Sequence, residues 1–463
     1  MHHPSAAQVQ PSFAVWGRVF VLVGIGVVNV LAVWFILTYT TTYPLAIDEW
    51  IRNVPLTTLW LDGRLTVQHL ISLQSPVVAA PPGPQMVSWL LSLPNVILLH
   101  WNLRLDAMLN YFLIVINAVL LLSLIGREGG RRWLLGIPVV ALLLAVQQRY
   151  TLLVGAHKYF HMHILCAYLM LYALVCLRPT WRTLFMAMGA AFFATFSIFS
   201  GGIVWLVTLP FLAALGYRRA MIAAWLLGGA LSLWLFVNLP GFTLNSEFYM
   251  TGGANPLILN RIVNGLLFVV TYIGGVFAAG PESALLPAMT LGAMAVGLFA
   301  LNLWVLRRSS ERRLILLCSV LALYGLLFGV LAAVGRADGY GVRGALLEHY
   351  IPFSVQIWIA LSGMMALTFR HMLSRTTRPS FVMTANLVVL LLGTVFYGSA
   401  ALETVKYAEA HRSFVAEAEQ CIVETAAGQR DNTNGCLVVG GYALPEWIKS
   451  LAGHQLTGFA PKP

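Results

Sequence analysis

The sequence predicts an all-α, polytopic membrane protein, and its composition and its apolar runs are the two observations behind this prediction. Of the 463 residues, 59% are hydrophobic and only 10% are charged, with a mean hydropathy of +0.80. Soluble domains carry roughly 25% charged residues. Many runs reach the ~20 apolar residues with which a helix crosses a bilayer. They are continuously apolar, whereas the strands of a β-barrel alternate in polarity, so we expect helices.

Twelve apolar runs are candidate transmembrane helices, and basic residues in the short loops between them set their orientation. Arg18 precedes the first run, Arg127 follows the second, Arg178 the fourth and Arg218 the sixth. Because Lys and Arg are enriched in cytoplasmic loops, these loops and the N-terminus are predicted to be cytoplasmic. The runs lie at 17–39, 105–126, 133–147, 162–177, 183–199, 202–217, 220–238, 262–280, 284–306, 314–335, 351–369 and 381–402.

Residues 257–283 break this alternation. Two apolar runs lie between the preceding external loop and the basic loop at Arg307, so both loops cannot have their predicted sides if both runs cross the membrane. The segment carries four glycines and Pro281, so we expect a re-entrant or interfacial element, which is tolerated where protein surrounds it. About eleven helices (11 to 12) then cross the membrane, and the C-terminus is external. Cytoplasmic loops receive 15 of the 28 Lys and Arg residues but only Glu128 and Glu311 of the 17 acids.

The chain divides into a transmembrane domain, residues 1–402, and an external tail, residues 403–463. The N-terminus lacks a signal-peptidase pattern, so the first run is predicted to be a retained signal anchor. The first external loop covers 40–104, and its stretch 87–101 is too short to span and is expected to lie in the membrane interface. The net charge of +11 sits mostly in short loops, so no nucleic-acid partner is predicted.

The external tail begins with residues 403–427, which have the pattern of an amphipathic helix. Cys421 and Cys436 follow in a compartment predicted to be oxidising. They form a disulfide or remain two unpaired cysteines. Cys166, Cys176 and Cys318 lie within apolar runs, where we expect them to be small buried hydrophobic residues.

Asp48 and Glu49 are the first candidates for chemistry. Two adjacent carboxylates directly after the first span are costly in such an apolar chain unless they have a role. A carboxylate at the interface can act as a general base on an acceptor hydroxyl, or hold a divalent cation beside a phosphate. The alternative is an exposed pair at a helix N-terminus, favoured by the helix dipole.

A second polar cluster occupies residues 147–163. Arg149 and Lys158 are candidates for neutralising a lipid phosphate. His157 and His161 would share one helix face at a spacing that suits a metal ion, but no carboxylate accompanies them locally. Polar anchoring in the interface is therefore the expected role of the two histidines.

The third cluster is the glycine-rich loop 335–350. Glycines free its backbone, and Arg336 and Arg343 present forked donors that match phosphate oxygens. The loop ends at His349 and Tyr350. It is either a phosphate-lipid clamp or a solvated turn between two spans. No P-loop, dinucleotide fingerprint, metalloprotease helix or nucleophile elbow occurs in the sequence.

These features together resemble the GT-C superfamily of polyprenyl-phosphate-sugar-dependent glycosyltransferases. More narrowly, the order of four segments is similar to that in a group of bacterial polytopic membrane proteins with GT-C-like architecture. Two departures stand out: residues 80–85 replace a polar Asn-Glu-His-Arg stretch, and Glu348-His349-Tyr350 replaces Ser-Arg-Tyr. The four segments are Trp101 to Asp106, Thr195 to Gly202, Gly335 to Tyr350 and Cys421 to Cys436.

The resemblance implies transfer of a sugar from a polyprenyl-phosphate donor to an acceptor at the outer face of the cytoplasmic membrane. Asp48 would be the base, and Glu49 would orient it or bind a cation. The leaving lipid phosphate would be bound by a basic and polar set. That set is Arg149, Lys158, Arg336, Arg343, His349 and Tyr350. A transporter or a non-catalytic membrane subunit with protein partners is the alternative.

Overall fold

The computed structural model describes residues 10–46, 48–72, 85–126, 135–240, 258–278, 285–373, 381–430 and 445–459. These residues form helices and no strands, which confirms the predicted fold class. Within these described ranges, ten helical segments are long and apolar enough to cross a membrane, so the chain is a multi-pass membrane protein. They are Trp16–Tyr39, Leu103–Ile125, Gly136–Leu153, Gly155–Cys176, Arg219–Val237, Asn260–Phe277, Leu285–Leu306, Arg312–Tyr340, Glu348–Leu373 and Phe381–Ala410.

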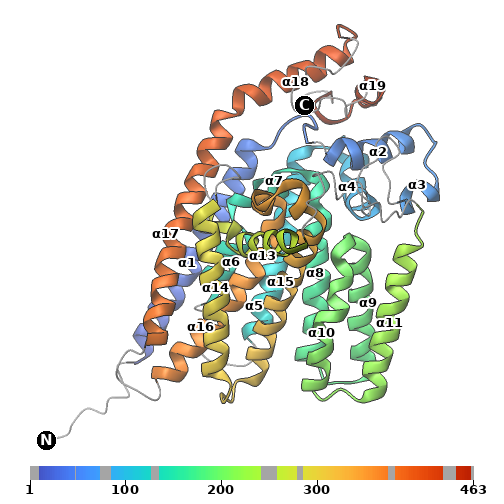
Figure 1. Cartoon of the computed structure of the whole chain (residues 1–463). Coiled ribbons are helices and arrows are strands. Elements are labelled where there is room, and N and C mark those ends of the chain that lie inside the picture. Colours follow the sequence, from blue (N-terminus) through green and yellow to red (C-terminus); the bar gives the residue numbers. More distant parts are fainter. Residues whose placement is uncertain are drawn as a thin grey trace, which may run out of the picture.

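Every predicted apolar run contains a helix. The helices are α1 (Gln10–Tyr39), α5 (Leu103–Gly126), α6 (Gly136–Leu143), α8 (Lys158–Leu171), α9 (Trp181–Ser197), α10 (Ile203–Ala214), α11 (Arg219–Val237), α13 (Ile258–Gly274), α14 (Leu285–Leu306), α15 (Arg312–Tyr340), α16 (Ile351–Leu373) and α17 (Phe381–Ala410). The count of ten differs from the expected eleven for two reasons. α9 and α10 have only 17 and 12 residues and are not counted, whereas Asn260–Phe277, in the segment expected not to span, is long and apolar enough to be counted. Both nevertheless stand beside α8 and α11 in the bundle (Figure 1).

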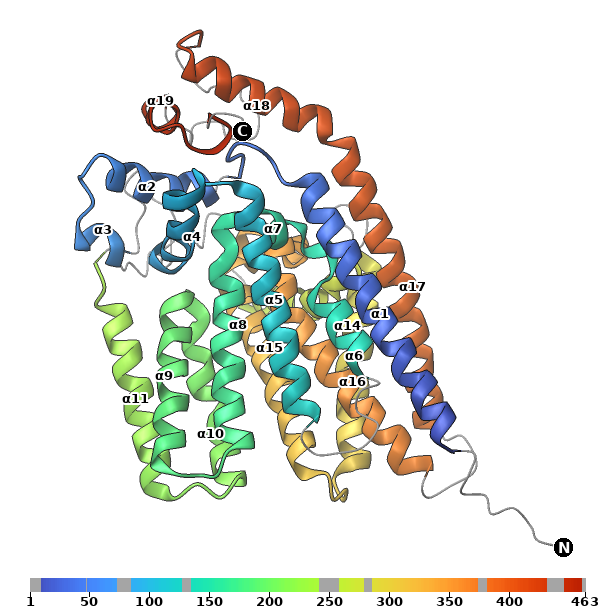
Figure 2. The same cartoon turned by 180° about the vertical axis from the view of Figure 1, so that it is seen from behind.

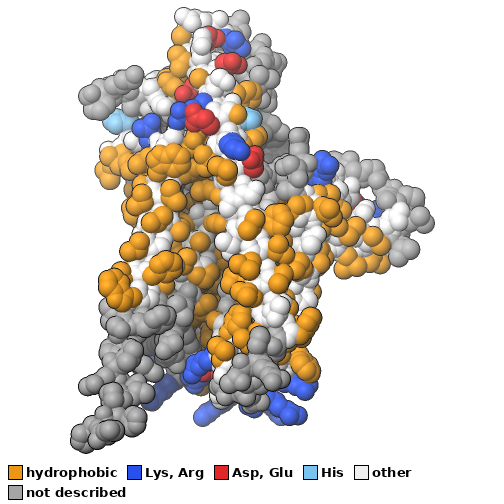
Figure 3. Space-filling model, turned by 90° about the vertical axis from the view of Figure 1, so that its left-hand side faces the viewer, with side chains coloured by type: hydrophobic (Ala, Val, Ile, Leu, Met, Phe, Trp, Pro, Cys, Tyr) orange, Lys and Arg blue, Asp and Glu red, His pale blue; other side chains and the backbone are white. Residues whose placement is uncertain are grey.

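The bundle has two ends of different character. Short helices gather at the end that is uppermost in Figure 1, here called the loop end: α2 (Val54–Leu61), α3 (Val67–Ile71), α4 (Gln85–Leu99), α18 (Arg412–Ala426) and α19 (Pro445–Gly453). The same arrangement is seen from behind in Figure 2. The opposite end holds the tight turns, such as the one between α14 and α15. Figure 3 shows hydrophobic side chains over the height of the bundle and Lys and Arg gathered at this opposite end, here called the arginine end.

Burial separates the helices into a centre and a periphery. The apolar part of Glu348–Leu373, which contains α16, is 89% buried, whereas those of α1 and α17 are 22% buried. α16 is therefore the central helix, and α1 and α17 present most of their apolar side chains outward. The segment before α16 carries Glu348, and the segment after α1 carries Asp48. Both residues contact Tyr150 at the loop end.

α13 is the helix within the segment expected to be re-entrant or interfacial. It runs across the bundle, transverse to α14 and α15, near the loop end (Figure 1). Arg261 at its start forms an ion pair of 3.4 Å with Asp338, near the end of α15. At the other end of α13, Gly274 lies against the backbone carbonyl of Ala288 in α14. Gly292 of α14 lies in the same way against the carbonyl of Val270 in α13, and a Cβ atom at either glycine would overlap this backbone. These two glycines let α13 and α14 cross in direct contact.

The first loop and the tail share a hydrophobic core of their own. Trp50, Trp101, Cys421 and Ile448 are all buried in it. Glu419 of α18 also accepts hydrogen bonds from the backbone N–H groups of Thr42 and Tyr43, at 2.6 and 3.3 Å. The tail thus holds the start of the loop that carries Asp48.

The tail differs in one detail from the predicted 403–427 helix. α17 continues without a break to Ala410, and α18 begins only at Arg412. Cys421 is disulfide-bonded, while Cys166, Cys176 and Cys318 are thiols. Cys436, its expected partner, lies outside the described residues, as do residues 80–84 of the predicted departure in the first loop.

Candidate functional site

Asp48 lies at the centre of a polar cluster at the loop end. Its carboxylate is 3.2 Å from Arg52 Nε and 3.2 Å from His157 Nε2, and it accepts a 2.9 Å hydrogen bond from the Tyr150 hydroxyl. Burial by itself raises the pKa of Asp48. The hydrogen bond and charge of His157, the charge of Arg52 and the hydroxyl of Tyr150 outweigh burial and hold this pKa well below its usual range. Asp48 is therefore a fixed carboxylate anion, and 22% of its side chain remains exposed.

His157 lies between two hydrogen-bond acceptors. Its Nδ1 lies 3.0 Å from the backbone carbonyl oxygen of Tyr150, and a carbonyl only accepts, so Nδ1 carries a hydrogen. The Nε2 atom then faces the Asp48 oxygen at 3.2 Å, a contact that requires a proton between the two atoms. The histidine is thus fixed by Tyr150 on one side and by the carboxylate on the other.

The end of α15, which carries Arg336, and the loop before α16 reach the same cluster. Arg336 Nη1 lies 3.2 Å from His349 Nε2, and the Arg336 guanidinium lies 5.6 Å from the centre of the Tyr350 ring. The charges of Arg336, His157 and Asp48 all act on His349. The structure therefore brings Arg336, His349 and Tyr350 together with Asp48, although some 290 residues separate them in the chain.

Glu348 joins this loop to Arg149. One carboxylate oxygen pairs with Arg149 Nε at 2.7 Å, and the other accepts the backbone N–H of Tyr150 at 3.1 Å. The guanidinium of Arg149 also lies 3.9 Å from the centre of the Tyr407 ring, near the end of α17. Arg149 is thus oriented by two elements at once, and a quarter of its side chain stays exposed.

Lys158 is the predicted phosphate ligand that the structure places elsewhere. Its side chain is fully buried, with Nζ 2.9 Å from Asp106 Oδ2 and 2.6 Å from the carbonyl of Gly155. Ser92, Asn95 and Trp101 complete the shell around Asp106, at 2.9, 2.9 and 3.0 Å. A cation enclosed in this way cannot reach a ligand, so we correct its predicted role from phosphate binding to structural support.

Glu49 faces away from Asp48 toward this buried pair. Its side chain is 3% exposed and accepts the backbone N–H of Gly155 at 3.2 Å. Burial raises the pKa of Glu49 to about 8, and the charge of Asp106 adds to the effect. The two adjacent carboxylates therefore have different states, since Asp48 is ionised and Glu49 holds a proton near neutral pH.

The remaining predicted residues lie apart from the cluster. Arg343 is exposed on the short helix Val342–Leu346. His161 is buried, with Nε2 3.2 Å from the carbonyl of Thr151. Within the described parts of the chain, no three His, Cys, Asp or Glu side chains form a group that could hold a metal ion. His157 and His161 are engaged by a carboxylate and by backbone, which gives them no shared metal geometry.

A cavity of about 350 Å³ opens next to the cluster. Glu49, Arg149, Tyr150 and Arg412 contribute to its wall, and the rest is formed largely by the end of α1, the segment after it and the start of α18. Arg412 pairs with Glu409 at 3.2 Å, and its side chain is 54% exposed. The cavity thus combines basic groups with an apolar wall at the boundary between the spans and the loop end.

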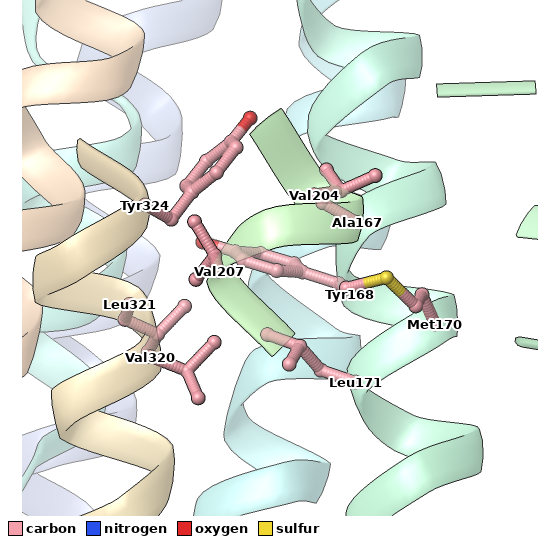
Figure 4. A pocket seen from close by; sticks show the side chains of 9 residues that line it. All are labelled: Ala167, Tyr168, Met170, Leu171, Val204, Val207, Val320, Leu321 and Tyr324. Atoms are coloured by element: carbon pink, nitrogen blue, oxygen red, sulfur yellow. The ribbon is translucent and has the colours of Figure 1, made fainter. Parts of the chain in front are cut away.

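A second, much smaller void lies inside the bundle. Figure 4 shows it between α8, α10 and α15, surrounded by side chains such as Leu171, Val207 and Leu321. Its volume is only about 10 Å³ and its surface is apolar. Tyr168 donates its hydroxyl to Gln356, 2.5 Å away. The polar groups that could do chemistry are therefore concentrated at the loop end.

Sequence reasoning missed Arg52 and Glu348. Arg52 follows Asp48 by four residues, a spacing that pairs opposite charges on a helix and was a usable signal. Glu348 offered no such signal, since its partner Arg149 is 199 positions away.

The chain was compared with protein-family models, with curated proteins and with solved structures, and none of the three comparisons gave a match. Fold and site together define a multi-pass, all-α membrane protein with a buried ionic cluster at one end of its bundle.

Proposed function

We propose that this protein is a GT-C-like glycosyltransferase of the bacterial inner membrane. It would move a sugar from a polyprenyl-phosphate donor to an acceptor at the outer face, with the N-terminus cytoplasmic and the C-terminus external. The observation that carries the proposal is the ionised Asp48, held by His157 and Arg52. Its hydrogen-bond donor Tyr150 lines the adjacent cavity together with Arg149. The resemblance of the ordered sequence segments to that superfamily supports it.

Asp48 would accept the proton of the acceptor hydroxyl. Cleavage of a glycosidic bond passes through an oxocarbenium-like transition state. As the new bond to the sugar forms, the acceptor oxygen becomes strongly acidic, so an ionised carboxylate of low basicity suffices. His157 and Tyr150 would act as positioning residues, because they fix the carboxylate that takes the proton.

Arg149 and Arg336 would stabilise the leaving lipid phosphate. Negative charge grows on the phosphate as the bond to the sugar breaks, and preorganised guanidinium groups stabilise that charge. Arg149 is held by Glu348 and Tyr407, and Arg336 is held next to His349, so both are already oriented. Lys158 has no part in this step.

Replacement of Asp48 tests the proposal. Full-length protein in membrane vesicles would be incubated with radiolabelled polyprenyl-phosphate sugars, and transfer would be followed by extraction of the lipid. We expect Asp48→Asn to reduce transfer by at least about 100-fold, the range of a lost acid–base group. Asp62→Asn is the matched control, because Asp62 lies in the same loop and is more exposed. Full transfer by Asp48→Asn would contradict the assignment of the base.

If the wild-type protein consumes none of these donors, the rival assignment as a non-catalytic membrane subunit is favoured. Affinity purification in mild detergent would then recover a stoichiometric membrane partner. The two functions therefore predict different results with the same preparation.

A further inference from the structure

A basic cavity lies at the arginine end of the bundle, remote from Asp48. It has a volume of about 530 Å³ and is formed where α10 and α14 end and α15 begins. Arg307, Arg312 and Arg313 line it together with Ser309. The proposed glycosyl transfer uses none of these residues.

The three arginines lack carboxylate partners within the part of the chain that the structure describes. Glu311 is the acid of this loop, and it pairs with Arg370 at 3.1 Å instead. Arg307 lies 5.0 Å from the centre of the Trp304 ring, a contact that leaves its positive charge uncompensated. At the loop end, by contrast, Arg52, Arg149 and Arg412 all pair with carboxylates.

The start of α15 adds to the positive character of the cavity. This helix begins at Arg312, which is part of the cavity wall. The start of a helix carries a partial positive charge and favours an anion. The phosphate oxygens of a ligand could accept hydrogen bonds both from the start of the helix and from the guanidinium groups.

The apolar part of the wall decides between a lipid and a soluble anion. Leu215, Ile315 and Leu316 line the cavity beside the arginines, so its wall is apolar where it continues toward the spans. Trp304, one helical turn before Arg307, is 58% exposed, which is typical of a tryptophan at a membrane surface. The cavity therefore lies at the depth of lipid headgroups.

We propose that this cavity binds the phosphate headgroup of an anionic phospholipid from the leaflet at the arginine end, predicted to be the cytoplasmic one. The phosphate contacts Arg307, Arg312 and Arg313, and the first part of the acyl chains packs on Leu215, Ile315 and Leu316. Basic pockets between transmembrane helices are a general mode of recognising such headgroups.

A lipid titration tests this proposal. The full-length protein in a nonionic detergent would be titrated with short-chain phosphatidylglycerol and, separately, with short-chain phosphatidylcholine, with bound lipid counted by native mass spectrometry. We expect at least tenfold tighter binding of phosphatidylglycerol. The triple variant Arg307→Gln, Arg312→Gln, Arg313→Gln should lose this preference, since each surface arginine contributes about fivefold.

Two further variants keep the result interpretable. The control Arg178→Gln, Arg182→Gln, Arg219→Gln removes the same charge from exposed arginines that do not line the cavity, and it should keep the preference. Leu215→Trp fills the cavity without changing charge, and it should lose binding. An equal loss in the control would overturn the proposal in favour of diffuse surface charge. Displacement of phosphatidylglycerol by excess inorganic phosphate would overturn it in favour of a small soluble anion.

Discussion

At the scale of single residues, the site depends on how burial and charge act on two adjacent carboxylates. Asp48 is stabilised as an anion by three donors, and Glu49 is buried without a cation in contact. The local sequence pattern does not distinguish the environments of the two side chains. Their pKa values differ because Asp48, the N-cap residue of the helical turn Glu49–Asn53, points toward His157, whereas Glu49 points toward Gly155.

The raised pKa of Glu49 predicts a pH-dependent stability. A carboxyl group with a pKa of about 8 in the folded state and 4.5 as the ordinary value stabilises the fold below 4.5. That contribution falls as pH rises from 4.5 and is lost by about 8. Glu49→Gln keeps a neutral group, so its melting temperature relative to wild type should rise steadily over this range. Thermal unfolding of both proteins in detergent at several pH values measures this difference in melting temperature. A difference that stays constant with pH would contradict the raised pKa of Glu49.

The buried pair of Lys158 and Asp106 predicts a large effect on stability. Removing one partner of a buried ion pair costs about 3–5 kcal/mol, because the other charge stays buried and unpaired. We expect Lys158→Ala to lower the melting temperature strongly. The double variant Lys158→Met, Asp106→Asn should recover much of the loss, since it leaves no isolated charge. Equal stability of Lys158→Ala and wild type would restore Lys158 as a candidate ligand.

At the scale of elements, the contact between α13 and α14 determines where the loop before α16 lies. α13 packs against α14, α15 and the short helix Val342–Leu346. Phe268 and Tyr272 of α13 contact the ring of Tyr350, at 6.1 Å each between ring centres. The transverse helix thus supports the segment that carries Arg336 and His349.

The close crossing of these helices predicts opposite effects for two glycine substitutions. Gly274→Ala should destabilise the protein, because its Cβ would overlap the Ala288 carbonyl. Gly297→Ala in α14 has open space around its Cβ and should be neutral or stabilising by up to about 1 kcal/mol, the helix propensity difference. Unfolding temperatures of the two variants give the comparison. Equal effects would show that the helices do not cross in direct contact.

At the scale of the whole molecule, the distribution of charge predicts its orientation in the membrane. Ser309 lies in the turn at the arginine end, and Gln429 lies beyond α18 at the loop end. In intact cells, a membrane-impermeant maleimide should label Gln429→Cys and should leave Ser309→Cys unlabelled until the cells are opened. The parent for both variants should lack the three thiols of Cys166, Cys176 and Cys318. The reverse pattern would invert the topology and move Asp48 to the cytoplasmic side.

The class of the fold and the segments that form its helices could be predicted from the amino-acid pattern alone. Every apolar run became a helix, because a continuous stretch of apolar residues in a bilayer has to satisfy its backbone hydrogen bonds within itself. The pattern also identified Asp48, Arg149, Arg336 and His349, because polar residues next to apolar spans are costly and therefore conspicuous.

Which of these residues lie together follows from the packing of the helices and not from the sequence pattern. This packing joined Asp48 to His157 and Arg52, and it joined Arg149 to Glu348. It also removed Lys158 from the candidate phosphate ligands, because Lys158 is buried against Asp106 and no local sequence pattern indicates this contact. The cause is that the pKa of a carboxyl group, and the groups that a cation can contact, depend on residues far away in the chain. Those neighbours exist only after the helices have packed.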